Sequence, residues 1–251
     1  MEHFHSIPRL EGESTAESVG MCGRFVNFTV AEELLSTTAE LPGLAPVRAD
    51  GPLPTSRYNI GPTMPIVALA REHPGRTGTI AATVRWGLIP QWARELPTTP
   101  FFNARAETWQ SKPTFRDGLP CAIPMNGWYE LKNRQPYFVS FGEDAPLFTV
   151  AGLWARWGDI VSATILTTDA VGQLADLHHR MPRVLADDEV SDWLDLSAWA
   201  ANGDVGMTSA KVVDKLTIRP VNRAVGNVAN DGLHLLDEPD GAATGHNEEL
   251  F

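Results

Sequence analysis

Frequent glycines and prolines divide this chain into short apolar runs, which limits the length of the elements that it can form. Its 251 residues include 21 Gly and 19 Pro. The runs between them are rich in β-branched and apolar side chains, a pattern typical of strands. Strands are predicted at 64–70, 79–86, 119–125, 137–141, 147–154 and 160–168. We therefore expect an α+β fold rich in β-structure, with curved sheets around a central cleft and a few flanking helices.

One helix is expected near the start of the chain. Thr29-Val30-Ala31-Glu32 is a capping-box sequence, and it predicts a helix through about Leu41. Residues 42–56 follow, with four prolines and two glycines, and they are predicted to form a surface loop.

Two further helices are expected late in the chain. The first is predicted at 187–200, with Asp187 and Asp188 in its first turn, where carboxylates suit the helix dipole. The second is predicted near 208–215, before a short strand at 216–221.

Length and composition indicate one globular domain, which we place at 21–236. Residues 1–20 are polar without periodicity, and we interpret them as a disordered leader or a mis-assigned start. Residues 237–251 are acidic and rich in small residues, and a disordered tail is predicted there. Two cysteines are too few for a disulfide framework, which fits a reducing cytoplasm. No run approaches the roughly 18 apolar residues of a membrane helix, so no membrane association is expected.

The net charge of −11 argues at first against nucleic acid as a partner. Most of that charge lies in the two terminal segments, however, and residues 21–230 are close to neutral. Arginine, whose planar guanidinium suits phosphate, supplies most of the bases of this central part. Composition therefore permits a nucleic-acid partner but does not predict one.

The dipeptide Met21-Cys22 resembles a translation start followed by a residue that becomes terminal when Met is removed. A terminal cysteine carries an α-amine and a thiol on adjacent carbons, a pair of nucleophiles that no internal residue supplies. We see three ways to reconcile this with the twenty residues that precede Met21: translation begins at Met21, the leader is removed, or the full-length form is inactive.

Six segments place polar residues beside aromatic residues and glycines. They are 57–62 (RYNIGP), 85–92 (RWGLIPQW), 103–108 (NARAET), 124–130 (PMNGWYE), 178–182 (HHRMP) and 220–227 (PVNRAVGN). Taken singly, each has an ordinary structural explanation; 103–107, for example, also fits a helix start with an internal ion pair. Together with MCGRF at 21–25, they are more specific.

In this order, the segments resemble the SRAP family (SOS-response-associated peptidases, or abasic-site processing proteins) from Cys22 to Asn227. The resemblance implies an SRAP-like fold and a cytoplasmic DNA-repair protein, associated with the nucleoid when bound to damaged DNA. Its partner would be single-stranded DNA with abasic sites, to which the N-terminal cysteine links covalently as a thiazolidine. A monomer is expected. So is the absence of a cofactor and of a metal, because the cysteines and histidines lack ligand spacing.

The resemblance also implies roles for particular residues. Four would be catalytic: the nucleophile Cys22, the sugar-holding Asn103, the carboxylate Glu130 and the histidine His178, which assists ring opening. Six would contact DNA or lie beside it: the phosphate-contacting Arg24, Arg105 and Arg180, then Pro62 and Trp92 along the DNA path, and Thr167 near the active site. Family members often carry a second aromatic residue after Trp92, where this chain has Ala93, so one stacking contact fewer is expected.

These residue types suit the reaction. An abasic site exposes an aldehyde, which condenses with an unprotonated amine; at neutral pH roughly 10% of a terminal amine is unprotonated, against under about 0.1% of a lysine. The thiol then closes a five-membered ring on the imine carbon. Glu130 and His178 suit proton transfer, and Asn103 can hold a sugar hydroxyl without competing for the proton. Arginines on phosphates and Trp92 against a base suit a single strand.

Two other functions fit the same residues. A Cys–Glu–His set could act as a thiol peptidase, either on the chain before Cys22 or on other proteins. The chain could also bind single-stranded DNA without reacting.

Several residues of these segments have simpler explanations. Trp86 and Trp128 are expected in the core or the cleft wall, and Cys121 in the core. Glu107 is interpreted as a partner of Arg105. His179 is interpreted as a bystander.

Overall fold

Two β-sheets form the framework of the protein, whose computed structural model describes residues 23–71, 78–195 and 206–239. The larger sheet has the strand order β12-β11-β10-β7-β4-β5-β2, with β6 and β13 added beside β11 and β10. Its strands are β2 (Val47–Asp50), β4 (Pro65–Arg71), β5 (Thr79–Trp86), β6 (Asn103–Arg105), β7 (Leu119–Met125), β10 (Phe148–Trp157), β11 (Ile160–Asp169), β12 (Arg180–Pro182) and β13 (Val184–Leu185). Because β5 pairs with both β4 and β11, the strands β11, β10, β7, β4 and β5 form a closed ring.

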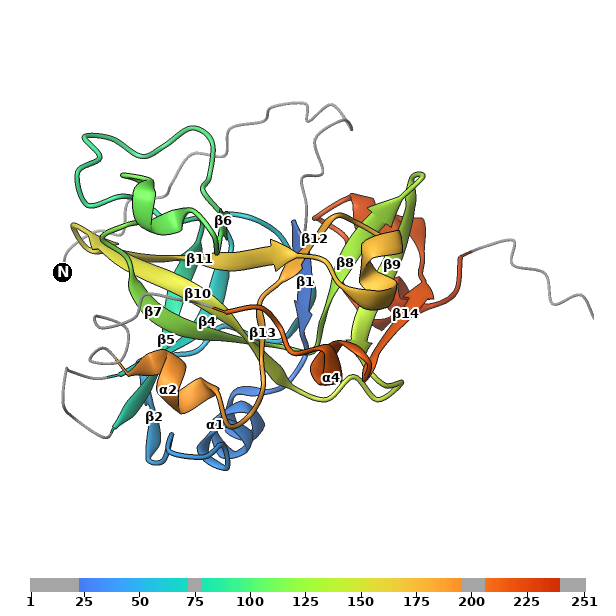
Figure 1. Cartoon of the computed structure of the whole chain (residues 1–251), viewed down its shortest axis with the longest axis horizontal. Helices are drawn as coiled ribbons and strands as arrows, with labels where there is room; N and C mark the ends of the chain where they lie inside the picture. Colours follow the sequence, from blue (N-terminus) through green and yellow to red (C-terminus); the bar gives the residue numbers. More distant parts are fainter. Residues whose placement is uncertain (1–22, 72–77, 196–205, 240–251) are drawn as a thin grey trace, which may run out of the picture.

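The smaller sheet has the order β14-β9-β8-β1-β3. Its strands are β1 (Arg24–Asn27), β3 (Arg57–Ile60), β8 (Gly127–Lys132), β9 (Gln135–Phe141) and β14 (Leu216–Pro220). Figure 1 shows β8, β9 and β14 at one end of the molecule, with β1 between them and the larger sheet.

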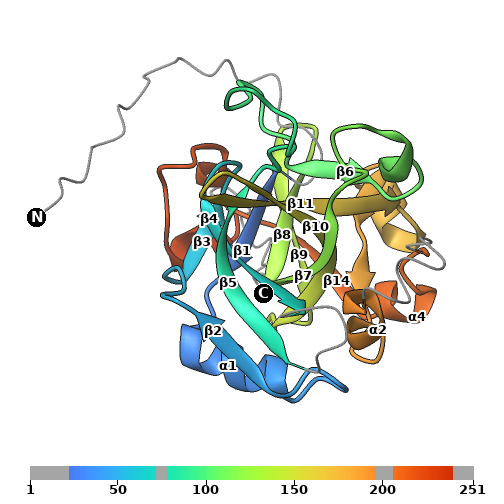
Figure 2. The ribbon, with the colours of Figure 1, turned by 90° about the vertical axis from the view of Figure 1, so that its left-hand side faces the viewer.

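Short helices complete the fold. They are α1 (Ala31–Ala39), α2 (Val190–Leu194) and α4 (Ala210–Val213), with 3-10 turns η1 (Trp109–Ser111), η2 (Gly172–Asp176), η3 (Arg223–Gly226) and η4 (Leu233–Leu236). In both Figure 1 and Figure 2, α1 and α2 lie at the same end of the larger sheet. The described part of the chain holds no helix of the length and hydropathy that a membrane span requires.

The core has one layer on each face of the larger sheet, as β4 shows. Ile66 and Ala68 join a cluster that contains residues of both sheets, whereas Val67 and Leu69 point the other way, into a cluster with side chains of α1 and α2. This alternation follows from the two-residue period of a strand. The sheet is therefore buried on both faces, which explains why its long strands are almost continuously apolar.

The predicted fold class is confirmed, because the protein is rich in strands and poor in helices. The six predicted strands and the one at 216–221 all form, within three residues of their predicted bounds. Cys121, Trp86 and Trp128 are fully buried, as expected. The single domain at 21–236 stays a prediction. The predicted leader and most of the predicted tail lie outside the described residues.

The predicted capping box is wrong. The N-cap of α1 is Val30, and no side chain caps the helix. Thr29 instead donates its hydroxyl to Asn126 Oδ1 over 3.1 Å, and that oxygen also accepts from the backbone of Phe28. Asn126, a buried residue between β7 and β8, therefore binds the side chain that was expected to cap the helix.

Three other local predictions need correction. The loop predicted at 42–56 contains β2, which pairs in parallel with β5. The described part of the helix predicted at 187–200 is α2 alone, so Asp187 and Asp188 precede it; residues 196–200 lie outside the described residues. The helix near 208–215 is the four-residue α4.

The glycine of the PMNGWYE segment provides a test of packing between strands. A Cβ on Gly127 would lie 2.4 Å from the ring of Phe138 and 2.6 Å from the carbonyl oxygen of Val139, both on the adjacent strand β9. We expect Gly127→Ala to lower the free energy of unfolding by about 1–3 kcal/mol, because β8 and β9 must separate. Gly226→Ala, whose Cβ would meet nothing within 4 Å, is the control for denaturant unfolding. Equal stability of the two variants would contradict this account.

Candidate functional site

An aromatic contact joins the two sheets next to Arg24 and Asn103, which adjoin Phe25 and Phe102 in the chain. The rings of Phe25 (β1) and Trp86 (β5) are 5.0 Å apart, and those of Trp86 and Phe102 are 5.7 Å apart. Trp86 also donates its indole N–H to the carbonyl oxygen of Phe102 over 2.9 Å. Asn103 comes directly after Phe102, and it pairs with Ile165 of β11. The start of β1 and the start of β6 are therefore both held against Trp86.

Asn103 lies on the side of its sheet that faces the shared core. Trp86 pairs with Ala163, and Asn103 pairs with Ile165 two residues further along β11. Positions two apart on a strand share a face, and Trp86, Ala163 and Ile165 all belong to the cluster that joins both sheets. Asn103 is therefore a strand residue. The alternative interpretation of 103–107 as the start of a helix is wrong.

Glu130 lies on the corresponding face of the smaller sheet. It follows Trp128 by two residues on β8, and Trp128 pairs with Phe25 in the same core cluster. One residue beyond the observed pairing of Arg24 with Tyr129, Gly23 comes opposite Glu130. Glu130 is 4% exposed, and Gly23 is buried without a side chain of its own. The carboxylate therefore sits beside the entry of the chain into β1.

Cys22 lies outside the described residues. Chain connectivity alone keeps its Cα about 3.8 Å from that of Gly23. The prediction that a carboxylate stands beside the cysteine is compatible with this register, and it stays a prediction.

The ring of His178 is held by the backbone of Arg180. His178 Nδ1 lies 3.0 Å from the backbone nitrogen of Arg180 and 3.2 Å from the carbonyl oxygen of the same residue. Burial lowers the pKa of His178, and His179 and Arg180 lower it further, while the carbonyl of Arg180 opposes them. Because the backbone of Arg180 holds Nδ1, the nitrogen that can face a substrate is Nε2. Leu174 and Leu177, from η2 and the turn after it, anchor this segment in the shared core.

Arg180 is buried in a cluster of carboxylates. It donates to both oxygens of Glu107 over 2.7 and 2.9 Å and to Asp169 over 2.5 Å, and its side chain is only 4% exposed. Glu107 therefore pairs with Arg180, and its predicted pairing with Arg105 is wrong. Both of its terminal nitrogens hold acceptors of the protein, and the predicted contact of Arg180 with phosphate stays a prediction. The cluster ties together the ends of β6, β11 and β12.

Thr167 is fully buried inside this cluster. Its carbonyl oxygen accepts from Arg180, and its hydroxyl donates to the carbonyl oxygen of Ala104 over 3.3 Å. It lies next to the predicted site, as a link between β11 and β6, with no surface for direct contact to DNA.

Arg24 and Arg105 differ from Arg180 in their surroundings. Arg24 is half-buried and donates to Asn59 Oδ1 over 3.3 Å and to the carbonyl oxygen of Val225 over 3.0 Å. Burial lowers its pKa. Arg105 ends β6 and is exposed. The described residues place no carboxylate in an ion pair with Arg24 or Arg105, so both can meet an anion.

Pro62 and Trp92 lie on either side of Trp86 in the chain. Pro62 is half-buried, and the next residue, Thr63, donates its N–H to the carbonyl oxygen of Trp86 over 2.6 Å. Trp92 is 58% exposed, and its indole N–H donates to the carbonyl oxygen of Pro113 over 3.0 Å. The Trp92 ring borders an open depression of about 390 Å³, which Pro90, Ala93, Arg94, Glu95, Pro97 and Phe101 also line. An exposed but fixed indole suits stacking on a base.

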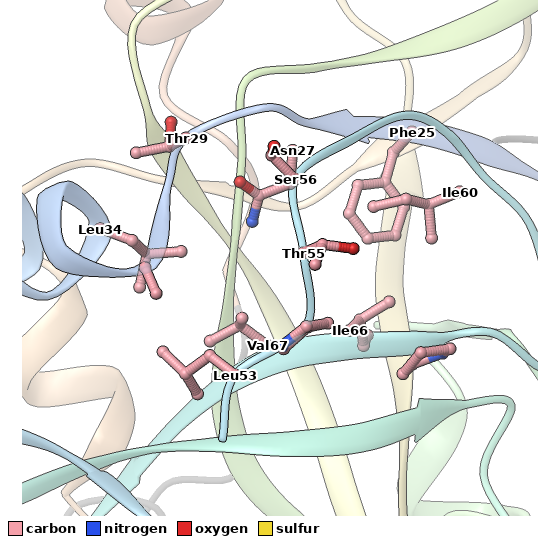
Figure 3. A pocket seen from close by; sticks show the side chains of 13 residues that line it. Phe25, Asn27, Thr29, Leu34, Leu53, Thr55, Ser56, Ile60, Ile66 and Val67 are labelled. Atoms are coloured by element: carbon pink, nitrogen blue, oxygen red, sulfur yellow. The ribbon is translucent and has the colours of Figure 1, made fainter. Parts of the chain in front are cut away.

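A second, smaller cavity lies away from these residues, between β1, β4 and the start of α1 (Figure 3). Its free volume is about 10 Å³, room for about one water. Asn27 Oδ1 is buried at its edge and has no hydrogen-bond partner in the described part of the protein. The cavity is too small for a nucleotide or a sugar, so it is not a substrate site.

Sequence analysis assigned no role to two asparagines that are buried in the structure. Asn126 joins the turn after β1 to the start of β8, and Asn59 joins β3 to residues 225–230. Both occur in segments that stood out by composition, RYNIGP and PMNGWYE, but only their long-range partners show what they do. Within the described ranges, no group of three or more His, Cys, Asp or Glu side chains could hold a metal ion.

Comparison with known proteins finds a family and several relatives that match most of the chain. Residues 21–228 match the family described as SOS response associated peptidase (SRAP). The abasic site processing protein YoaM of Bacillus subtilis is 30% identical over 86% of this chain and 98% of its own length, and YedK of Escherichia coli is 30% identical over 86% and 99%. HMCES of Gallus gallus, also called an abasic site processing protein, is 29% identical over 69% and 63%. A crystal structure from Bordetella bronchiseptica matches with a TM-score of 0.64 and 25% identity, over 80% of this chain and all of the other.

The Glu107–Arg180 pair predicts a specific dependence of stability on pH. The hydrogen bonds that Arg180 donates to Glu107 hold the pKa of this carboxyl group below its ordinary value. The pair therefore stabilises the fold at neutral pH. It loses this effect as the pH falls through the lowered pKa of Glu107. Glu107 is 46% exposed, so solvent screening limits the effect to about 1 kcal/mol or less. We expect Glu107→Gln to be less stable than the wild type at pH 7 and to approach it below about pH 4.

Chemical denaturation at a series of pH values measures this difference. Glu143→Gln, at an exposed position after β9, is the control and should follow the wild type throughout. If the free energy of unfolding of Glu107→Gln stays below that of the wild type by the same amount in acid, the carboxylate does not act through its charge.

Proposed function

This chain belongs to the SOS response associated peptidase family, and we propose that it processes abasic sites in single-stranded DNA by forming a covalent crosslink through Cys22. The observation that carries the proposal is the convergence of the site around Trp86 and Trp128. By strand register, Glu130 and Asn103 lie on the sheet faces that carry the shared core cluster, and Gly23, next to Cys22, lies opposite Glu130. The relatives named above as abasic site processing proteins support the same substrate.

The proposed reaction uses both nucleophiles of a terminal cysteine. The α-amine of Cys22 adds to the aldehyde carbon of the open deoxyribose to give a carbinolamine. This species loses one water and forms an imine. The thiol then adds across the C=N bond: sulfur bonds to carbon, and the proton passes to nitrogen. The product is a five-membered thiazolidine, and one water is released overall.

Glu130 and His178 supply the proton transfers. Glu130 lies opposite Gly23 by register and can take a proton from the amine and return it to the hydroxyl that leaves as water. His178 would act as the imidazolium and give the proton of Nε2 to the sugar ring oxygen as the ring opens; the lowered pKa of His178 makes that form a stronger acid. Asn103 offers a neutral amide to a sugar hydroxyl from the same core-facing side.

The DNA strand would lie over the exposed groups near this site. Arg24 and Arg105 would contact phosphates, and Trp92 would stack against a base, with Pro62 between them along the path. Arg180 would keep β6, β11 and β12 aligned and need not contact DNA itself.

The chemistry requires a free amine on Cys22. A protein with residues 1–21 still attached would carry a peptide bond at that nitrogen, which cannot form an imine. We expect protein that starts at Cys22 to give a heat-stable band shift with single-stranded abasic DNA on a denaturing gel. Protein that retains residues 1–21 and the Cys22→Ala variant should give none. Intact-mass measurement must establish the terminus of each sample.

The outcomes separate three activities. A crosslink formed equally by Cys22→Ala would contradict the mechanism. Turnover of peptides without reaction toward abasic DNA would favour a peptidase. Binding that is sensitive to salt, with no crosslink, would indicate a passive single-strand binder.

Glu130→Gln and His178→Ala test the proton transfers. We expect Glu130→Gln to slow crosslinking about 100-fold, the lower end of general acid–base catalysis, with DNA affinity unchanged. His178→Ala should slow the reaction with the closed-ring sugar, because the donor to the ring oxygen is lost. His179→Ala, which changes the adjacent ring, is the matched control. Single-turnover rates at wild-type values in both active-site variants would remove these residues from the mechanism.

A further inference from the structure

The RYNIGP and PVNRAVGN segments, which lie far apart in the chain, meet at one buried amide. Asn59 is completely buried. Its Nδ2 lies 3.2, 3.0 and 3.1 Å from the carbonyl oxygens of Val225, Asn227 and Asn230. Three carbonyls of residues 222–231, which we call the C-terminal strap, thus converge on one side-chain amide of β3.

Other contacts fix the strap on the same strand. Asp231 accepts from the backbone N–H of Tyr58 over 2.7 Å and pairs with Arg57 at 3.4 Å. A Cβ on Gly61 would lie 2.9 Å from Val228 Cγ2, so the strap lies directly against the turn that follows β3. These contacts hold the strap against β3 of the smaller sheet.

Arg24 is enclosed between Asn59 and the strap. Its Nη1 donates to Asn59 Oδ1 and to the carbonyl oxygen of Val225, and its Nε lies 3.3 Å from the position of a Cβ on Gly61. Both acceptors are neutral. By contrast, Arg180 and Arg183 are buried arginines beside the larger sheet, and each of them pairs with carboxylates.

A half-buried guanidinium without a counter-charge is costly unless an anion arrives to pair with it. The identity of residue 59 decides whether Arg24 has a counter-charge, because aspartate has the same shape as asparagine but would neutralise Arg24. We propose that Asn59 is a positioning residue that holds Arg24 through neutral acceptors only, so that the charge of Arg24 remains available to a DNA phosphate beside the abasic site. This inference rests on the proposed function. It extends that function by assigning a task to Asn59 and to the strap.

Asn59→Asp tests the proposal, because it keeps the shape of residue 59 and supplies the missing counter-charge. Binding is measured by fluorescence anisotropy on intact single-stranded DNA without an abasic site, over a series of salt concentrations. We expect an affinity about tenfold lower and a slope of log K against log salt reduced by about 0.7, the value for one phosphate contact on a single strand. Arg24→Gln should give the same changes.

A double-mutant cycle shows whether Asn59 acts through Arg24. The variant with both changes should bind no more weakly than Arg24→Gln alone, whereas independent effects would add. Ser36→Asp adds the same charge to an exposed side chain of α1, which belongs neither to the strap nor to the predicted site, and should change affinity less than about twofold. Additive losses, or an Asn59→Asp affinity and slope equal to those of the wild type, would overturn the proposal.

Thermal unfolding checks that the variants fold. If Asn59→Asp does not, Asn59→Ser takes its place: it removes the amide without adding charge, and it should weaken binding only while Arg24 is present. Wild-type affinity of Asn59→Ser would overturn the proposal. Crosslinking is measured in parallel. Wild-type protein that binds DNA but forms no crosslink contradicts the proposed function alone, and wild-type protein that binds no DNA contradicts both.

Discussion

The contact of Phe25 and Phe102 with Trp86 is the interaction on which the rest of the site depends. These three rings come from β1, β5 and the residue before β6, and they meet in the core layer that both sheets share. Buried aromatic side chains contribute the largest apolar areas in a core. The indole N–H of Trp86 also fixes the carbonyl of Phe102. The start of β6, after Phe102, and the start of β1, at Phe25, are consequently both held against Trp86.

Charge is distributed over this framework in two ways. Arg180 and Arg183 are paired with carboxylates, and each links elements that are distant in sequence. In each pair the arginine is buried but the carboxylate is partly exposed, so the pair fixes the geometry of these elements while solvent screening limits its contribution to stability. Arg24 has amide and carbonyl acceptors only. The same residue type therefore serves as a structural anchor where acids surround it and as a candidate anion contact where they do not, and composition cannot distinguish the two.

Sequence predicted the long strands well because their signal is local. A strand such as β4 or β7 is buried on both faces, and its apolar run is visible without its partners. Most of the strands that were missed, β1, β3, β6 and β12 among them, have three or four residues, and pairing alone defines them. The same limit explains two wrong assignments. Thr29 was expected to cap its own helix and Glu107 to pair with its near neighbour, whereas their partners, Asn126 and Arg180, lie 97 and 73 residues away.

The site residues were predicted by resemblance, and the structure gives some of them a physical reason. Glu130 is the clearest case. The register of β1 against β8 brings it opposite Gly23, which is buried and has no side chain of its own. Because β3 and β8 occupy both edges of β1, the proposed mechanism uses the strand's own N-terminal continuation to present the amine, next to this carboxylate.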